Sequence, residues 1–546
     1  MLVGKAIIDR LMERGIDTVF GIPGKQSLPL NEAIGQRDGI QFVVARHETA
    51  VTHQAWGYAE TSGRMAATVV VPGPGDMNAM NGLKNALNDC TPLLHFAIET
   101  DPEFRGGDAI HETPPDTYDN VVKENFLVAN PEGATATVDR AIRIARRPPQ
   151  GPVRVGIPKS YLTADVPLAA SAEAPSDWEK EPPAGAIEEA TDLLVSATNP
   201  VIVAGGGVRS SNATPELRDV AERLTAPVVT TYKGKGVLPE DHRLSAGVLS
   251  GSASPELLDL LEKADAALVV GSDLDAHATR GWTVDLPEQS VHVTLGIDDI
   301  GTGYNPTVGI VADAKATLAS LDDRLTAIEM PATAPDDRAV TVRTATRDRI
   351  GPLLDDEPPI TSVRALRAIR EALPREAVVA VDAGGFRVWG LNVFEAYGPR
   401  QYVNPGSWAT MGSGLPSAIG AQLANPESQV VSLTGDGGLM MCVHELHTAV
   451  AEELPLTVVV LNNNDYAIIS EEAGRTYDLE SGEYGWPDAA IDFATIAEGM
   501  GMSAEQADTP AEIREALDTA LATDEPTLLE IRTDPTEPQA GEFFSG

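Results

Sequence analysis

The 546-residue sequence contains only two cysteines, Cys90 and Cys442. Two distant thiols supply neither a disulfide framework nor the four ligands of a structural zinc site. The sequence also has no apolar run near the roughly 20 residues that cross a bilayer. Its first segment, residues 1–15, carries charges throughout, unlike a secretory signal peptide. We therefore expect a reduced, cytoplasmic protein that is not inserted in a membrane.

Positive charge is scarce as well. The chain has 40 lysines and arginines against 81 acidic residues, which gives a formal net charge of −41. The acids are dispersed, lysine is rarer than arginine, and no basic stripe is present, so nucleic acids and anionic membranes are not expected partners. An acidic surface poor in lysine is typical of proteins that work in molar salt. We predict a halophilic source; the alternative is an acidic mesophilic enzyme.

The order of apolar runs, turns and helical patterns indicates an α/β fold. The chain is too long for one core, and strands alternate with helices in three regions, residues 1–165, 183–330 and 360–535. The stretches between them, 165–182 and 330–359, have linker compositions. We predict three doubly wound domains with parallel sheets, which bind ligands beyond the carboxyl ends of their strands. The expected strands are 18–20, 41–45, 66–71, 93–98, 153–157, 201–204, 228–231, 266–270, 291–295, 378–381, 430–433, 456–461 and 527–531.

Residues 429–470 form the most informative stretch, because they have the pattern of a βαβ unit. One apolar run ends at the turn Gly435–Gly438, the next ends at Asn462–Asn464, and residues 440–451 between them have helical spacing. A right-handed crossover would lay the two strands side by side. Asp436 and Asn463 would then meet at the carboxyl edge of the sheet. Their oxygens and a backbone carbonyl just past Asn463 would form half of an octahedral cage that suits Mg²⁺.

The glycines around Asp436 predict what the metal would carry. Without Cβ atoms, the backbone amides of Gly437 and Gly438 can approach a phosphate at the start of the following helix. A Gly-Asp-Gly alone is most often a plain turn. Its combination with Asn463 at the end of the next strand is more specific and predicts a diphosphate bound through Mg²⁺.

A second glycine-rich turn, Gly205–Gly207, follows a strand of the middle region. In a dinucleotide-binding fingerprint the third glycine would fall on Ser210, and no acidic residue stands where one would bind a ribose. A nicotinamide dehydrogenase is therefore an alternative with an incomplete motif. FAD in this region is likewise possible but has no clear motif.

Several segments in order resemble thiamine diphosphate (ThDP) enzymes that act on 2-oxo acids. They are ARHETAVTHQAWGYAETSG at 45–63, VPGPGDMNAMNGL at 71–83, PGSWATMGSGLPSAIGAQLA at 405–424, and the paired GDGG and NNN turns. The acetolactate synthase group is most similar, with benzoylformate decarboxylase a near relative. The resemblance covers essentially the whole chain. It implies a pyrimidine-binding (PYR) domain, a central Rossmann-like domain and a diphosphate-binding (PP) domain, in that order.

The resemblance also implies roles for individual residues. Asp436, Asn463 and the carbonyl of Asp465 would hold Mg²⁺. Glu48, at the end of a buried strand, would hold a proton beside the aminopyrimidine ring. The backbone carbonyl of Ala409 would accept the ring's amino group, and Met411 would wedge the cofactor into its folded shape. The implied cofactor-binding positions are Glu48, Gly384, Gly385, Ala409, Met411, Asp436, Gly437, Gly438, Asn463 and Asp465.

The implied activity is decarboxylation of a small 2-oxo acid with carboligation, as in acetolactate synthase. One alternative is a non-ligating decarboxylase of the benzoylformate type. Another, from a different class, is a non-catalytic cofactor-binding regulatory subunit, against which the intact Glu48, Asp436 and Asn463 argue. In the family, Glu48 of one subunit would face the metal site of its partner. The resemblance thus implies an obligate homodimer, often paired into a tetramer.

Four places depart from the synthase pattern, and at one of them Glu99-Thr100 stands where Gly-Gln is usual. Lys25 follows the turn Gly21–Gly24, where a small residue is usual, and a cation there would bind the acidic group of a substrate. His111 replaces a glutamine and would act as a proton donor. Residues 464–472 lack a Gln-Trp pair. Glu48, His111 and Lys25 are the predicted catalytic residues, and the departures argue against a role in branched-chain biosynthesis.

Overall fold

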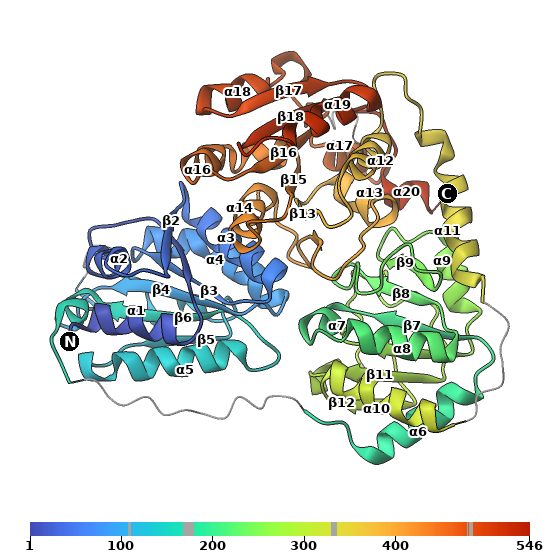
Figure 1. Ribbon diagram of the computed structural model, residues 1–546, viewed down its shortest axis with the longest axis horizontal. Helices are drawn as coiled ribbons and strands as arrows, with labels where there is room; N and C mark the ends of the chain where they lie inside the picture. The colour runs from blue at the N-terminus through green and yellow to red at the C-terminus, as the bar shows by residue number, and fades with distance from the viewer. Residues whose placement is uncertain (108–110, 168–179, 329–335, 478, 480–483, 546) are drawn as a thin grey trace.

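The computed structural model describes residues 1–107, 111–167, 180–328, 336–477, 479 and 484–545. These residues form three six-stranded sheets, one in each third of the chain. Every strand pair in them is parallel, and helices cover the sheets (Figure 1). The predicted α/β class with three doubly wound parallel sheets is confirmed. No helix within the described residues is long and apolar enough to span a bilayer.

The N-terminal sheet has the order β2-β1-β3-β4-β6-β5. Its strands are β1 Thr18–Gly21, β2 Gln41–Val44, β3 Ala66–Val70, β4 Leu93–Glu99, β5 Glu124–Leu127 and β6 Val153–Pro158. Its helices are α1 Val3–Glu13, α2 Leu28–Gly35, α3 Glu48–Ser62, α4 Pro74–Asn88 and α5 Ala134–Arg146. The strand before Glu48 was expected to be buried, which is wrong. As the edge strand of the sheet, β2 keeps Gln41 exposed and buries only Val43.

The middle sheet has the order β12-β11-β10-β7-β8-β9. Its strands are β7 Pro200–Ala204, β8 Val228–Thr231, β9 Ser245–Leu249, β10 Ala266–Val270, β11 Ser290–Thr294 and β12 Val308–Val311. Its helices are α6 Ala184–Ser196, α7 Gly206–Ser210, α8 Thr214–Leu224, α9 Pro255–Glu262 and α10 Ala314–Ala327. The expected linker 330–359 contains a further helix, α11 Arg338–Arg349. Its Ala339 and Val342 pack into the core of this domain, so the described part of that stretch is not a simple linker.

The C-terminal sheet has the order β14-β13-β15-β16-β18-β17. Its strands are β13 Val378–Val381, β14 Tyr402–Val403, β15 Val430–Gly435, β16 Leu456–Asn462, β17 Ser503–Ala507 and β18 Thr527–Arg532. Its helices are α12 Ser362–Ala372, α13 Gly385–Val393, α14 Gly414–Ala424, α15 Asp436–Met440, α16 Leu446–Ala451, α17 Ala467–Arg475, α18 Phe493–Met500, α19 Pro510–Ala520 and α20 Ala540–Phe543. Beyond residue 535, α20 packs against Trp389 of α13.

The predicted βαβ unit is present, with one correction. Strands β15 and β16 are adjacent and parallel, and Gly435 lies opposite Leu461, so the turns after both strands share one sheet edge. The single helix expected over 440–451 is wrong. Helix α15 ends at Met440, a 3-10 turn spans Val443–Glu445, and α16 follows. No proline or glycine marks this break in the sequence.

The N- and C-terminal domains are joined by α3 and α14, which make the most extensive helix contact among the described residues (Figure 1). Small residues permit this close approach. A Cβ atom on Gly57 would lie 2.2 Å from the Ser417 carbonyl oxygen. The middle domain is tied to both others by Lys233, whose Nζ donates to Glu60 (2.8 Å), Asp89 (2.9 Å) and the Asn404 carbonyl (3.1 Å). The three domains therefore form one assembly around buried contacts.

Candidate active site

One cavity of about 320 Å³ lies at the carboxyl edge of the C-terminal sheet. It collects nine of the ten predicted cofactor-binding residues from four separate turns: Gly384, Gly385, Ala409, Met411, Asp436, Gly437, Gly438, Asn463 and Asp465. These turns follow β13, precede α14, and follow β15 and β16. The position is the one at which parallel α/β sheets bind ligands.

Asp436 is the centre of this cavity's polar wall. It is 4% exposed. Its Oδ1 accepts the amide of Gly437 (2.7 Å), and its Oδ2 accepts the amide of Asp465 (3.2 Å). The Asn463 Oδ1 accepts the same Asp465 amide at 3.2 Å. Asp436 and Asn463 thus converge on one amide, as the βαβ pattern predicts.

The charge of Asp436 has no counterion among the described residues. Burial raises its pKa to about 6, although backbone amides that hydrogen-bond to it act in the opposite direction. A buried carboxylate without a cation is costly. The described residues contain no group of three His, Cys, Asp or Glu side chains that could hold a metal. One carboxylate, one amide oxygen and one carbonyl fit Mg²⁺ only if phosphate oxygens and water complete its shell.

Asp382, at the end of β13, fixes the opposite wall. Its carboxylate accepts the amides of Gly412 and Ser413, both at 3.1 Å, and the Thr434 hydroxyl at 2.9 Å. Burial raises the pKa of this group, and these donors oppose the rise. Because Asp382 bonds both the turn after Met411 and the end of β15, it sets how far Met411 stands from Asp436.

The turn that carries Met411 is strained. Ala409 has φ of 41°, in the left-handed region, which costs a residue with a Cβ about 1–3 kcal/mol. The Met411 methyl group also lies over Gly437, because a Cβ there would be 3.2 Å from it and 2.4 Å from the Tyr466 ring. A side chain at position 437 would therefore close the cavity. The backbone strain at Ala409 and the need for glycine at position 437 are both expected of a ligand-binding wall.

Glu48 lies outside this cavity, on the N-terminal domain. It begins α3, and the side chain of the preceding His47 caps the helix by accepting the Thr49 amide at 3.2 Å. Glu48 is half-buried, and its Oε2 accepts a hydrogen bond from Asn78 at 3.1 Å. Its Oε1 lies 2.9 Å from where a Gly75 Cβ would stand. A larger residue at position 75 would displace the carboxylate.

His111 lies against the same turn as Glu48. A Cβ on Gly73 would be 2.8 Å from the His111 Cα atom, and the Gly73 amide donates to Thr113 at 2.9 Å. His111 has φ of 65°, and within the described residues its buried Nδ1 has no hydrogen-bond partner. Residues 108–110 lie outside the described part. The structure thus brings Glu48 and His111 to opposite ends of the Gly73–Gly75 turn.

Lys25, the third predicted catalytic residue, is exposed and lines neither this turn nor the cavity. Other cavity residues had no signal in the sequence. Tyr466 directly precedes α17, and Ile468 lies in the first turn of that helix. Glu537 and Gln539 come from the segment that follows β18. Burial raises the pKa of Glu537 to about 7, and its carboxylate accepts the Ser362 amide at 2.5 Å. Local pattern cannot reveal residues that arrive from the far end of a domain.

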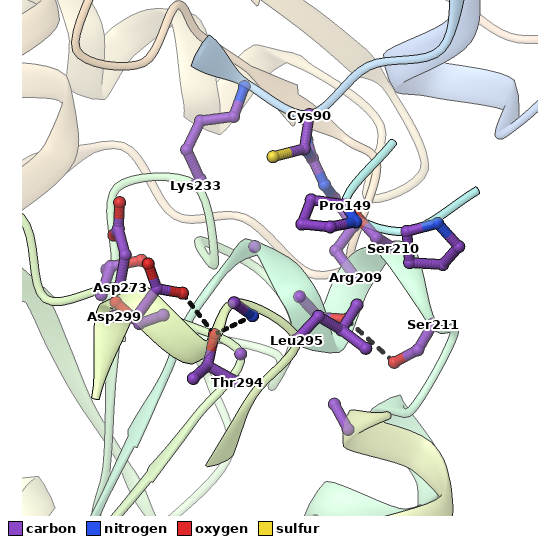
Figure 2. Close-up of a pocket in the computed structure, with 18 of the residues that line it drawn as sticks. Cys90, Pro149, Arg209, Ser210, Ser211, Lys233, Asp273, Thr294, Leu295 and Asp299 are labelled. Carbon is purple, nitrogen blue, oxygen red and sulfur yellow. Dashed lines mark hydrogen bonds between the residues drawn. The ribbon is translucent and has the colours of Figure 1, made fainter. Parts of the chain in front are cut away.

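A second cavity lies between the middle domain and the N-terminal domain. Figure 2 shows Cys90 and Pro149 of the N-terminal domain on one side, and Asp273, Thr294 and Asp299 of the middle domain on the other. The triple-glycine turn forms part of its lining. The Gly205 amide donates to the Val270 carbonyl (2.9 Å) and the Gly207 amide to the Gly271 carbonyl (2.8 Å). These two amides are therefore not free to bind a phosphate.

The charges of this second cavity do not suit a dinucleotide either. Its two cations, Arg209 and Lys233, already pair with Glu60 at 2.6 and 2.8 Å. The pKa of Asp273 rises to about 6 because of burial and the nearby carboxylates of Asp275 and Asp299. Among the described lining residues, a diphosphate would meet carboxylates and cations that are already paired. The residues present do not fit FAD or a nicotinamide dinucleotide, which also argues against the dehydrogenase alternative.

Three segments of the chain match the three domains of one known enzyme family. Residues 1–120 match the N-terminal TPP (thiamine pyrophosphate, another name for ThDP) binding domain of thiamine pyrophosphate enzymes. Residues 187–321 match the central domain, and residues 382–531 the C-terminal TPP binding domain. The chain is 30% identical to a probable acetolactate synthase large subunit of Methanocaldococcus jannaschii, over 98% of this chain and 92% of that protein.

Two further proteins are similar to this chain over nearly its whole length. The large subunit of acetolactate synthase isozyme 1 of Escherichia coli is 30% identical, over 97% of this chain and 94% of its own. Among solved structures, a thiamine diphosphate-dependent 4-hydroxybenzoylformate decarboxylase from Rhodococcus jostii superimposes with a TM-score of 0.83. It is 26% identical and covers 98% of this chain and 99% of that one. The similarity therefore spans all three domains in both cases.

Proposed function

Because the chain belongs to the thiamine pyrophosphate enzyme family, we propose that it is a ThDP- and Mg²⁺-dependent enzyme that decarboxylates a small 2-oxo acid with carboligation, in the manner of acetolactate synthase. The observation that carries this proposal is the cavity that gathers nine predicted cofactor residues around the uncompensated carboxylate of Asp436. The cavity fits a metal-bound diphosphate, and its strained Met411 turn fits a ring wedged above it.

Different residues would bind the metal ion and the diphosphate group of the cofactor. Asp436, Asn463 and the carbonyl of Asp465 would hold Mg²⁺, and the amide of Gly438 would face the diphosphate. The Gly437 amide, which the sequence also suggested for that role, instead donates to Asp436. Gly384 and Gly385 would close the other side of that group. Bound there, ThDP supplies a thiazolium ring that accepts the electrons left by the departing CO₂.

The ring end of the cofactor would be governed by three further groups. The carbonyl of Ala409 would accept the amino group of the pyrimidine, and Met411 would support the bend between the rings. Glu48 would hold a proton at the far pyrimidine nitrogen. Because Glu48 does not line the cavity of its own chain, we propose a homodimer in which each Glu48 serves the cavity of the partner.

Exposed apolar side chains support this assembly. Met77 follows the Gly73–Gly75 turn, and Trp408, Met440 and Met441 flank the cavity, yet all four are 43–53% exposed in the single chain. These side chains lie beside the Glu48 turn and beside the cavity, the two parts of the proposed site. Exposed apolar groups at both places are expected if a second subunit covers them. Whether two dimers pair into a tetramer stays a prediction.

A non-ligating decarboxylase is the second candidate, and His111 is the observation that favours it. Its imidazole lies at the Gly73–Gly75 turn, and its Nδ1 has no hydrogen-bond partner among the described residues, so it would deliver a proton to the carbon that has lost CO₂ before a second carbonyl compound adds there. The similarity to the Rhodococcus decarboxylase is consistent with this outcome. Lys25, on an exposed loop, would bind a substrate's acidic group only if the partner or the substrate brings the two together.

A product analysis separates the candidates. The protein, supplied with ThDP and Mg²⁺ in molar salt, is given pyruvate and benzoylformate in turn, and CO₂, aldehydes and ligated hydroxy-ketone products are quantified. A carboligase yields ligated products from pyruvate, whereas a simple decarboxylase yields aldehyde. Tight cofactor binding without CO₂ release from a wider panel of 2-oxo acids would instead identify a regulatory subunit. The cytoplasmic location and the halophilic source stay predictions.

A further inference from the structure

The turn that carries Glu48 is held by a buried carboxylate from the other end of the chain. Glu445 of the C-terminal domain is 0% exposed, and its Oε1 accepts the amides of Arg46 (2.8 Å) and His47 (3.0 Å). Its Oε2 accepts the side-chain amide of Gln54 (3.0 Å) and the hydroxyl of Thr448 (2.7 Å). Four donors, from two domains, therefore converge on one side chain.

The contact fixes both sides of Glu48. Arg46 and His47 immediately precede it, and Gln54 lies further along α3, which Glu48 begins. A helix start whose preceding amides and interior side chain share one anchor has little freedom to rotate. We propose that Glu445 is a positioning residue, which sets the direction of the Glu48 carboxylate toward the cofactor's pyrimidine ring. This inference rests on the proposed function.

The break in the predicted 440–451 helix is explained by the same contact. Glu445 stands nine residues after Asp436, at the end of the 3-10 turn between α15 and α16. The interruption gives the Glu445 side chain a direction toward the N-terminal domain. The segment that begins with the metal ligand of one site thus ends by holding the acid that, in the proposed dimer, serves the other site.

Neighbouring residues extend the clamp along the edge strand β2. The Arg46 Nε atom donates to His447 Nδ1 at 3.0 Å, and the Val44 amide donates to Glu452 Oε1 at 3.4 Å. His444 Nε2 lies 3.5 Å from Glu445 Oε1. Residues 444–452 therefore cover this edge of the N-terminal sheet, and Glu445, together with its partners Gln54 and Thr448, is fully buried there.

Two substitutions separate position from charge. Glu445→Asp keeps the carboxylate but shortens its reach by one methylene group. Glu445→Gln keeps the reach and one oxygen that can accept the amides of Arg46 and His47, but it removes the charge and replaces the acceptor of Gln54 and Thr448 by an NH₂ group. A positioning role predicts that Asp is more damaging than Gln. The matched control is Glu240→Asp, because Glu240 is also buried and accepts a backbone amide across a domain boundary, that of Ala396 at 2.7 Å, far from the Glu48 turn.

The first measurement needs no cofactor. Hydrogen–deuterium exchange of apoprotein peptides that span residues 44–50, followed by mass spectrometry, reports the amides of Arg46 and His47. We expect faster exchange in Glu445→Asp than in Glu445→Gln, and wild-type exchange in Glu240→Asp. Wild-type exchange in both Glu445 variants would overturn the proposal, since the carboxylate would then not hold this turn.

The second measurement is the rate at which the C2 proton of bound ThDP exchanges with deuterated water, read by proton NMR after acid quenching. Displacing a reacting group by about 1 Å can cost about a hundredfold, so we expect Glu445→Asp to exchange at least tenfold more slowly than wild type and Glu445→Gln to stay within about threefold. The Michaelis constant should change little. Equal rates in all variants, or a slower Gln than Asp, would refute positioning. A wild-type protein that exchanges the C2 proton but converts no 2-oxo acid would refute the proposed function instead.

Discussion

Replacing Asp436 by asparagine tests whether this site is built for a metal, because apoprotein and loaded protein should respond in opposite directions. In the apoprotein the ionised carboxylate is buried without a cation, and its pKa rises from 3.8 to about 6. At about 1.36 kcal/mol per pKa unit, that shift of about 2 units corresponds to about 3 kcal/mol of destabilisation at neutral pH. Asparagine removes the charge and with it this cost.

The substitution also loses a hydrogen bond. Asp436 accepts two backbone amides, from Gly437 and Asp465, and asparagine can accept only one of them, which costs about 1 kcal/mol. The apoprotein of Asp436→Asn should therefore be about 2 kcal/mol more stable than wild type at pH 7.5. If the C-terminal domain melts as a unit, its Tm should rise by about 4–8 °C.

The sign of the pH dependence follows from the direction of the shift. A carboxyl whose folded pKa is raised stabilises the fold at low pH and loses that contribution as pH rises from about 4 to about 6. Between pH 7.5 and pH 5 the wild-type apoprotein should regain about 1.4 kcal/mol from Asp436. The advantage of Asp436→Asn should shrink by the same amount over that range.

Ligand should reverse the order. Mg²⁺ and ThDP at a hundred times their dissociation constants would stabilise the wild type by about 2.7 kcal/mol, whereas the variant lacks the charged metal ligand and should gain little. Melting curves in molar salt, with EDTA or with both ligands, provide the measurement. A variant apoprotein less stable than wild type at pH 7.5, together with an unchanged ligand-induced rise in Tm, would show that Asp436 is a structural carboxylate.

Three further predictions can be checked on the same preparations. Glu48→Gln should lower turnover by about 10²- to 10⁴-fold while its Tm and cofactor binding stay at wild-type values; unchanged turnover would remove Glu48 from catalysis. Dialysis should unfold the protein, because the screening length grows from about 3 Å in 1 M salt to about 10 Å in 0.1 M and the net charge is −41; retained activity at low salt would contradict a halophilic source. The purified protein should show no flavin absorption and no rise in Tm with FAD, since burial and the carboxylates of Asp275 and Asp299 already raise the pKa of Asp273, and these carboxylates would repel a diphosphate; a yellow protein with bound flavin would disprove this reading.

Patterns of short range were sufficient to predict much of this molecule. The period of apolar residues located the two strands that end just before Asp436 and Asn463. The rule for parallel crossovers then placed these residues together, as their shared hydrogen bond to the Asp465 amide shows. The triple glycine at 205–207 was harder to interpret from sequence. The amides of Gly205 and Gly207 donate to carbonyls at the end of a neighbouring strand, and only the folded neighbours reveal that.

Features that depend on distant residues were not predictable. Nothing between 440 and 445 indicates a helix break, because the partners that Glu445 meets there are the amides of Arg46 and His47, some 400 residues earlier in the chain. The same holds for Gln539, which reaches the cavity from the tail beyond the expected domain end. A sequence window that predicts helix from apolar spacing contains no information about a donor in another domain.

The two failures share a physical origin that bears on how the site works. A carboxylate in water gains little by breaking a helix, but Glu445 in a buried boundary can satisfy four donors at once, and unmade hydrogen bonds there would each cost about 1–3 kcal/mol. That sum is large enough to override the helical preference of residues 440–451. Local sequence preference therefore gives way where two domains must be held in register, and in this chain that place lies between the candidate metal ligand Asp436 and the candidate acid Glu48.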